Sequence, residues 1–200
     1  MKKLILICLV LLSVKSFGQT KSEGFVQVLL NRLEFGIKAG ANYSDFTDAS
    51  FATDPLVGFH AGGTVAFKLG KNFSVQEDIL FSAVGAKSNN NEFGKQDIKL
   101  YYVSVPVLFR YKTNFGLYAE AGTQASFKVK EDVAGLAGGD FAKKLDFAAT
   151  GGIGFQSKMG LGIGARYIYG LSKVGNFDAS GSRNNFKNNN AQVSLFYTFK

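Results

Sequence analysis

The sequence has no tryptophan, two prolines, one cysteine and one histidine. A lone cysteine supports neither a disulfide framework nor a thiolate metal site. Its first apolar stretch is shorter than the about 20 residues that a membrane-spanning helix needs. These absences exclude a disulfide-stapled secreted domain and a helical membrane protein.

The sequence is instead rich in glycine, phenylalanine and tyrosine, with 24, 20 and 8 copies in 200 residues. Hydrophobic residues make up 46% of the chain, yet its mean hydropathy is only +0.05. This combination fits short alternations of apolar and polar positions. The length is sufficient for one domain with a sizeable buried surface.

The first residues have the pattern of a secretory signal. Lys2 and Lys3 form a basic start, Leu4–Val14 is apolar, and Ser16–Gly18 is a small-x-small cleavage site. We therefore predict a signal peptide over residues 1–18.

After cleavage the mature chain lacks cysteine, and its formal charge falls from +8 to about +5. Residues 19–32 are predicted to form a short periplasmic leader. No basic run follows, whereas a nucleic-acid-binding surface needs a basic stripe. We therefore expect no nucleic-acid partner.

Beyond Asn31 the chain shows period-two alternation, which is the signature of β-strands, and no sustained helical period. Each segment has the nine to eleven residues that a tilted strand needs to cross a bilayer. The predicted strands are Leu33–Ser44, Val57–Leu69, Phe73–Ala86, Gln96–Tyr111, Phe115–Lys130, Asp146–Gln156, Leu161–Gly170 and Ala191–Phe199.

Long and short connections alternate between these strands, as they do in outer-membrane barrels with external loops and periplasmic turns. Residues 33–200 are therefore predicted to form an all-β, eight-stranded, antiparallel up-and-down transmembrane barrel of the small OmpA/OmpX type. This order places both termini in the periplasm. The long connections are Asp45–Leu56, Lys87–Lys95, Glu131–Leu145 and Leu171–Asn190; the short ones are Gly70–Asn72, Lys112–Asn114 and Ser157–Gly160.

Each predicted strand has one apolar face and one polar face. The apolar faces carry about two Phe or Tyr residues per strand, which is too bulky for an eight-stranded interior. The polar faces carry most of the strand glycines. We therefore expect the apolar faces to meet lipid and the polar faces to line a narrow lumen.

Charges in such a lumen must pair to be tolerated. We expect a structural salt-bridge network in which Asp78 and Glu120 supply the acids. The predicted lumenal polar residues are Lys38, His60, Lys68, Asp78, Arg110, Glu120 and Arg166.

Aromatic residues recur eight positions apart on the apolar faces. Eight steps along a strand tilted by about 40° project to roughly 20 Å, close to the apolar band of such barrels. The predicted aromatic girdle consists of Phe35 and Tyr43, Phe59 and Phe67, Phe73 and Phe81, Tyr101 and Phe109, and Phe147 and Phe155.

Two residues depart from this pattern. Glu77 falls on the outward face, where contact with lipid is costly unless a bulge or the membrane interface relieves it. Pro106 removes a ladder donor from the fourth predicted strand, and we expect a local irregularity there.

The predicted strands contain two specific motifs, the Gly-Ile-Lys-Ala-Gly start at Gly36–Gly40 and the Val-Pro-Val-Leu segment Val105–Leu108. Together these motifs resemble the PorT-like outer-membrane β-barrel family of Bacteroidetes. The resemblance extends from about Leu33 to Lys200 and implies the barrel fold and an outer-membrane location. The founding member of that family is implicated in type IX secretion. The full segments that carry the resemblance are Phe35–Ser44, Gly58–Gly62, Phe73–Gln76, Tyr101–Leu108, Ala119–Gly122 and Gly162–Tyr167.

The terminal segment Leu195–Phe199 is similar to the aromatic-ended signal that the barrel assembly machinery recognises, although Lys200 follows it in place of a final aromatic residue. We therefore expect that machinery and the outer-membrane lipid as partners.

An enzyme is disfavoured, because His60 is the only candidate base and needs a nucleophile and an orienting acid. Thr64 and Glu120 are the residues considered for these roles. The glycine pair Gly151-Gly152 lacks the Gly-Lys-Ser/Thr of a phosphate loop, and Asp45 and Asp48 lack calcium-loop spacing. No cofactor or metal is expected.

The leading functional hypothesis is a small non-enzymatic barrel that binds an envelope or extracellular protein partner, or supports the envelope, through its external loops. The alternatives are an accessory of protein secretion, a narrow pore and a lipid-modifying barrel enzyme. A soluble lipocalin-like binder is the rival fold.

Overall fold

The computed structural model describes residues 24, 30–49, 53–88, 96–133, 142–175, 178–179, 182–183 and 186–199. The predicted signal peptide and most of the predicted leader lie outside these residues. The chain divides into two compact units, Met1–Leu33 and Glu34–Lys200, and the second contains the β-sheet described below. In the described part of the chain, no helix has the length and apolar character needed to cross a bilayer.

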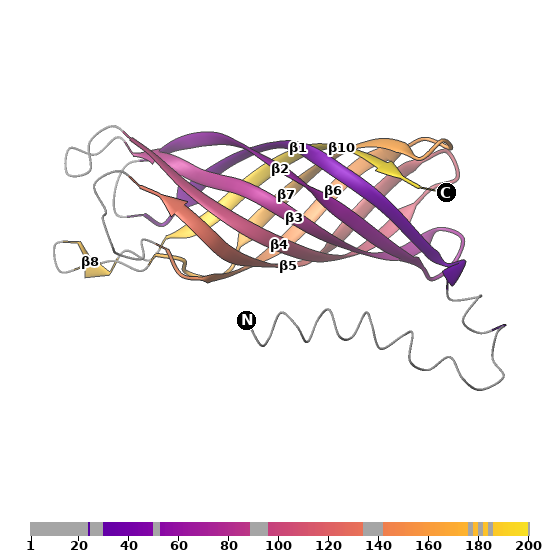
Figure 1. Cartoon of the computed structure of the whole chain (residues 1–200), viewed down its shortest axis with the longest axis horizontal. Coiled ribbons are helices and arrows are strands. Elements are labelled where there is room, and N and C mark those ends of the chain that lie inside the picture. Colours follow the sequence, from indigo (N-terminus) through magenta and orange to yellow (C-terminus); the bar gives the residue numbers. More distant parts are fainter. Residues whose placement is uncertain are drawn as a thin grey trace. The chain divides into compact units, whose positions relative to one another are not determined.

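Eight antiparallel strands form a closed barrel in the order β1-β10-β7-β6-β5-β4-β3-β2 (Figure 1). Neighbours in this ring follow one another in the chain, apart from the first and last strands, β1 and β10, which pair to close the barrel, and a small hairpin between β7 and β10. The predicted eight-stranded up-and-down barrel is therefore confirmed. The barrel strands are β1 (Leu33–Thr47), β2 (Thr53–Lys68), β3 (Phe73–Ser88), β4 (Gln96–Lys112), β5 (Leu117–Asp132), β6 (Leu145–Gln156), β7 (Leu161–Gly170) and β10 (Lys187–Thr198).

We call the two ends of the barrel the turn end and the loop end. The turn end carries the short connections β2–β3, β4–β5 and β6–β7, and the loop end carries the others. Phe199 N donates to Phe35 O at 2.7 Å, which joins the residue after β10 to the early part of β1 at the turn end.

Two of the short connections have the same hydrogen-bonded turn. Gly116 N donates to Thr113 O and Gly160 N donates to Ser157 O, both at 3.1 Å. Gly116 and Gly160 have φ values of 107° and 95°, which L side chains rarely adopt. Glycine at these positions therefore sets both turns.

Several strands extend further toward the loop end than predicted. β2 begins at Thr53 rather than Val57, and β10 begins at Lys187 rather than Ala191. The asparagines of β10 look like loop residues, but Asn189 Oδ1 accepts from Gly170 N at 2.9 Å and its Nδ2 donates to Thr47 Oγ1 at 3.0 Å. The Asn189 side chain therefore ties β10 to β7 and β1 without apolar alternation, so composition alone placed the boundary too late.

The predicted loop Leu171–Asn190 also contains secondary structure. β8 (Asp178–Ala179) pairs antiparallel with β9 (Ser182–Arg183) in a separate two-stranded sheet.

Pro106 interrupts the ladder between β3 and β4, as its missing donor predicts. Pairing stops after Glu77–Val107 and resumes at Leu80–Ser104 without a change of register. The other side of β4 is unaffected, because Pro106 still pairs with Gln124 of β5. The register shifts that do occur lie elsewhere, between Pro55 and His60 in β2 and between Tyr101 and Tyr102 in β4.

Side chains alternate strictly between the two faces of most strands. In β7 every odd residue is exposed and every even residue is buried. The exposed positions carry apolar side chains, all of them large except Ala165, and the buried positions carry three glycines, Arg166 and Ile168. The apolar face of the sheet therefore points outward and the polar face lines the lumen.

Candidate functional site: the filled lumen

Five charged side chains from five strands join in one chain of ion pairs across the lumen. Lys38 Nζ lies 2.8 Å from Asp78 Oδ2, and Arg166 Nη1 lies 2.6 Å from the same oxygen. Arg166 Nε contacts Glu120 Oε1, and Arg110 Nη2 lies 2.6 Å from Glu120 Oε2. Cations and anions therefore alternate in the order Lys38, Asp78, Arg166, Glu120, Arg110.

The network is buried and spans the barrel. Asp78 is fully buried, and the other four residues are at most 6% exposed. Strands β3 and β7 lie on opposite sides of the ring, so the Asp78–Arg166 pair crosses the full lumen. Gln76 Nε2 donates to Asp78 Oδ1 at 2.6 Å and occupies the other carboxylate oxygen. Both carboxylate oxygens of Asp78 therefore have hydrogen-bond partners, which a charged group needs in a low-dielectric interior.

Two inward aromatic rings pack against the cations of the network. The Arg110 guanidinium carbon lies 4.1 Å from the centre of the Tyr118 ring and 5.6 Å from that of Phe196. Tyr118 and Phe196 meet edge to face with their centres 5.9 Å apart. Phe196 was not among the lumenal residues predicted from sequence.

Inward glycines on β6 and β7 make room for these rings. A Cβ atom on Gly154 or Gly164 would lie within 2.5 Å of Tyr118, and one on Gly162 would lie 2.2 Å from Phe196 Cζ. Glycine at these lumenal positions therefore makes room for large aromatic side chains.

His60 forms a separate hydrogen-bonded layer with Asn42 and Ser194. His60 Nδ1 lies 2.7 Å from Asn42 Oδ1, and Nε2 lies 2.8 Å from Ser194 Oγ. Asn42 Nδ2 already donates to the carbonyls of Phe59 and Ala83, both at 2.9 Å. Asn42 Oδ1 is therefore an acceptor, so His60 carries its proton on Nδ1 and accepts from the Ser194 hydroxyl at Nε2.

These partners differ from Thr64 and Glu120, the residues considered from sequence for the disfavoured enzyme. Ser194, His60 and Asn42 form a hydrogen-bonded series of hydroxyl, imidazole and amide, which resembles the nucleophile, base and orienting group of some hydrolases. However, Asn42, His60 and Ser194 are at most 3% exposed, and a Cβ on Gly40 would lie 2.8 Å from His60 Cε1. All three side chains are therefore closed off from solvent.

Lys68 does not join the network, contrary to expectation. It lies at the turn end, where its Nζ is 2.7 Å from Glu34 Oε1, and its side chain is 46% exposed. Lys68 is the last residue of β2, so its inward parity places it at the mouth of the barrel.

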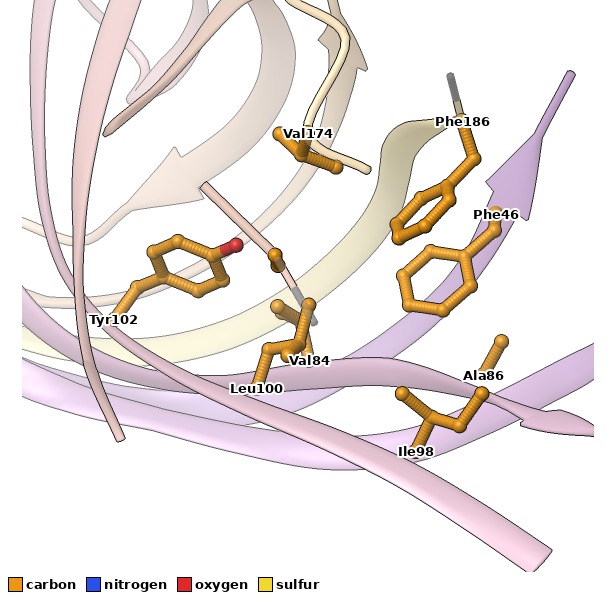
Figure 2. Close-up of a cluster of buried hydrophobic side chains, with 9 residues drawn as sticks. Phe46, Val84, Ala86, Ile98, Leu100, Tyr102, Val174 and Phe186 are labelled. Carbon is orange, nitrogen blue, oxygen red and sulfur yellow. The ribbon is translucent and has the colours of Figure 1, made fainter. Parts of the chain in front are cut away.

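The lumen near the loop end is apolar, although the sequence predicted a polar lumen throughout. Figure 2 shows side chains from separate strands converging on one cluster. The rings of Phe46 and Phe186 lie 4.3 Å apart at their centres. The cluster, which we call the apolar cap, consists of Phe46, Val84, Ala86, Ile98, Leu100, Tyr102, Ala142, Val174 and Phe186.

Parts of two predicted loops fold inward to complete this cap. Val174 N donates to Phe186 O at 2.8 Å, and Lys143 N donates to Val174 O at 2.7 Å. Lys128 Nζ binds Glu131 Oε2 at 2.6 Å and also contacts the Ala142 carbonyl. One sign of an apolar cap was present in the sequence. Phe46 is even-numbered, like Lys38 and the other residues of β1 whose side chains point into the lumen.

The ten aromatic residues of the predicted girdle lie on the outer face of the barrel. Phe59, Phe81 and Tyr101 form a row over three neighbouring strands, with ring centres 6.1 and 5.9 Å apart. Phe73 also contacts Tyr111 at 5.0 Å. Contact of these rings with lipid stays a prediction.

Not all of these aromatic residues are equally open to the surroundings, which the sequence did not predict. Phe67 and Tyr101 are half-buried, whereas the other eight are exposed. Phe155 is 41% exposed, and its ring lies against the β4–β5 turn, where a Cβ on Gly116 would be 3.0 Å from Phe155 Cε2. Phe67 and Phe155 each stand one residue before the end of their strand, so both belong to the turn end of the girdle.

Glu77 also lies on the outer face, as its parity predicted. It is half-buried between Val65 of β2 and Val107 of β4, its neighbours in the ladder. No register shift lies beside it, so a bulge does not account for its place there.

The described residues contain no group of three His, Cys, Asp or Glu side chains that could hold a metal ion. The lumen is occupied at three levels, by the ion-pair network, by the His60 layer and by the apolar cap.

A comparison of the sequence with known protein families identifies the family of this closed barrel. The profile of the outer membrane protein beta-barrel domain matches residues 17–176. The chain belongs to this family. Its location is therefore the outer membrane. A search of curated proteins finds no significant match.

Solved structures share the fold at low sequence identity. Neisserial surface protein A is 16% identical, with a TM-score of 0.56, covering 82% of this chain and 97% of that one. OprG from Pseudomonas aeruginosa is 15% identical, with a TM-score of 0.54, covering 83% and 95%. The attachment invasion locus protein Ail of Yersinia pestis is 18% identical, with a TM-score of 0.50, covering 83% and 98%. These likenesses show the fold alone.

Proposed function

We propose that this chain is a non-enzymatic barrel that presents its loop end to an envelope or extracellular protein partner. The filled lumen carries this proposal. A barrel whose interior is occupied by ion pairs and an apolar cap is suited to anchoring a surface in the membrane. Recognition is then left to the segments that extend beyond the strands, where function usually concentrates.

The proposal includes an orientation in which the turn end, with both termini, faces the periplasm. Cys8 lies in the predicted signal, so single cysteines can be introduced into a mature chain that has none. A membrane-impermeant maleimide on intact cells should label Lys173→Cys at the loop end and spare Lys71→Cys at the turn end. Labelling of Lys71→Cys alone would reverse the orientation.

Partner binding can be tested with a photo-crosslinking amino acid in intact cells. Incorporation at Asp178, in the β8–β9 hairpin, should give a protein adduct, and incorporation at Lys71 serves as the matched control. Replacing residues 176–185 with a Gly-Ser linker of equal length should remove the adduct without affecting heat-modifiable migration of the barrel. Adducts from Lys71 alone, or none from either position, would count against a partner at the loop end.

The finer assignments of family and processing belong to this proposal. We infer PorT-like membership from the Gly36–Gly40 and Val105–Leu108 segments, cleavage after Gly18, and recognition of Leu195–Phe199 by the assembly machinery. Mass spectrometry of the membrane-extracted protein should give Gln19 as the first residue. A mature chain that retains residues 1–18 would refute the signal peptide.

A role as a secretion accessory has no support from the comparisons. A pore is opposed by the buried ion network and the apolar cap, and an enzyme by the enclosure of His60 and Ser194. A null strain with normal protein secretion would end the secretion alternative, and single-channel conductance in planar bilayers would revive the pore.

A further inference from the structure

A concave basic vestibule opens at the turn end of the barrel. Two adjoining cavities of about 320 and 380 Å³ share Glu34, Lys68, Lys112, Gln156 and Thr198 among their lining residues. These volumes lie at the lower end of the range of ligand sites, about 300–1,000 Å³. We define the vestibule as these two cavities together.

The charged side chains of the vestibule are mostly basic. Five cations line it, Lys68, Lys71, Arg110, Lys112 and Lys158, against the single acid Glu34. Glu34 is already paired with Lys68 at 2.7 Å. A cleft lined by one sign of charge between low-dielectric walls focuses its field and concentrates counter-ions.

Hydrogen bonds among the lining residues hold the rim of the vestibule in place. Lys112 Nζ donates to Gln156 Oε1 at 2.9 Å, and Gln156 Nε2 donates to Thr198 Oγ1 at 2.8 Å. Asn72 Nδ2 donates to the Lys112 carbonyl at 2.6 Å, which ties the β2–β3 turn to the end of β4. These bonds connect four strands or turns around the rim.

Arg110 gives the vestibule a positive floor. Its Nε and Nη2 bind Glu120 Oε2 at 3.0 and 2.6 Å, and Tyr118 covers the guanidinium at 4.1 Å. These contacts fix the plane of the guanidinium while the side chain still lines the cavity. A planar guanidinium with basic neighbours suits the oxygens of a phosphate or carboxylate.

We propose that the vestibule binds a small oxyanion that carries several phosphate or carboxylate groups. The ligand would enter from the turn end, with Arg110 at the floor and Lys112 and Lys158 at the rim. Under the orientation proposed above this ligand is periplasmic, but binding itself does not depend on that orientation.

The test uses the full mature barrel in nanodiscs of neutral phosphatidylcholine, titrated calorimetrically with pyrophosphate and with citrate. Either anion should bind, more weakly at higher NaCl because salt screens the attraction. Lys112→Gln/Lys158→Gln should weaken binding about tenfold or more, as expected for the loss of two charge-assisted hydrogen bonds. The preferred anion identifies which oxyanion chemistry the site takes.

A matched control removes the same charge elsewhere. Lys143→Gln/Lys144→Gln changes two exposed lysines near the loop end and should leave binding unchanged. Lys68→Gln/Lys71→Gln, at exposed positions beside the β2–β3 turn, provides a second vestibule pair if the first fails to fold. Absence of binding for both anions, or equal weakening by the control pair, would overturn the proposal.

Discussion

Arg166 Nη1 lies 2.6 Å from Asp78 Oδ2 and connects strands β7 and β3 across the barrel lumen. The same guanidinium also contacts Glu120, so one side chain neutralises two buried carboxylates. Its replacement leaves both carboxylates short of a cation.

Arg166→Met should therefore destabilise the barrel by about 3–5 kcal/mol, the usual cost of breaking a buried pair. Urea titration of the barrel in lipid vesicles measures this loss. Lys68→Met is the control, because its exposed pair with Glu34 should contribute at most about 1 kcal/mol. Equal effects of the two substitutions would show that the lumenal network is not a stabilising element.

Gly154→Ala should destabilise the barrel by about 1–3 kcal/mol, since the added methyl overpacks the lumen. Its Cβ would lie 2.4 Å from the Ile163 carbonyl oxygen and 2.5 Å from Tyr118 Cζ. Gly151→Ala is the matched control, because its Cβ points outward and meets nothing closer than 4.0 Å. The urea midpoint of the control should stay near that of the parent, and a fall as large as that of Gly154→Ala would contradict the packing argument.

Phe186→Ala should cost about 3–5 kcal/mol, because it opens a cavity in the apolar cap. Lys173→Ala, a neighbour of the cap with a side chain outside it, should have little effect. The same urea titration compares them. If Phe186→Ala unfolds like the parent protein, the inward-folded segment adds no stability.

Ser194 should be inert toward a fluorophosphonate probe, despite its hydrogen bond to His60, because both side chains are buried in the lumen. Intact-protein mass spectrometry of the folded barrel gives the readout, and Ser194→Ala gives the background. Labelling of Ser194 that disappears in His60→Ala would instead establish an activated nucleophile.

The strand and turn pattern was predictable because it is local. Alternation along β7 is readable within a few residues, and Gly160 lies in the predicted turn Ser157–Gly160. Gly116 was placed in the predicted strand Phe115–Lys130, whereas β5 begins at Leu117 and Gly116 belongs to the β4–β5 turn. Charge pairing was also foreseeable in outline, since Lys38 and Arg110 share the inward parity of their strands. Five of the seven predicted lumenal residues lie in one network. All five lie within barrel strands, so their inward direction does not depend on the conformation of a loop.

The partners of individual residues were not predictable in the same way. His60 of β2 meets Ser194 of β10, 134 residues away, because both strands are neighbours of β1 in the closed ring. The apolar cap draws on Val174 and Phe186 in a segment whose asparagines and glycines indicate a loop. The partial burial of Phe67 likewise depends on its neighbours in space, which parity does not identify. These contacts follow from how the chain folds back, and period-two patterns do not contain that information.

The central claim is that the apolar face of this sheet contacts lipid and the opposite face lines a filled lumen. The chain has no tryptophan, so a single one can report on either face. Phe109→Trp places it on the outer face and Tyr102→Trp in the lumen.

The deciding measurement is quenching of each tryptophan by brominated phospholipid in refolded vesicles, after heat-modifiable migration confirms folding. We expect strong quenching for Phe109→Trp and little for Tyr102→Trp. Quenching of Tyr102→Trp with none for Phe109→Trp would contradict the account.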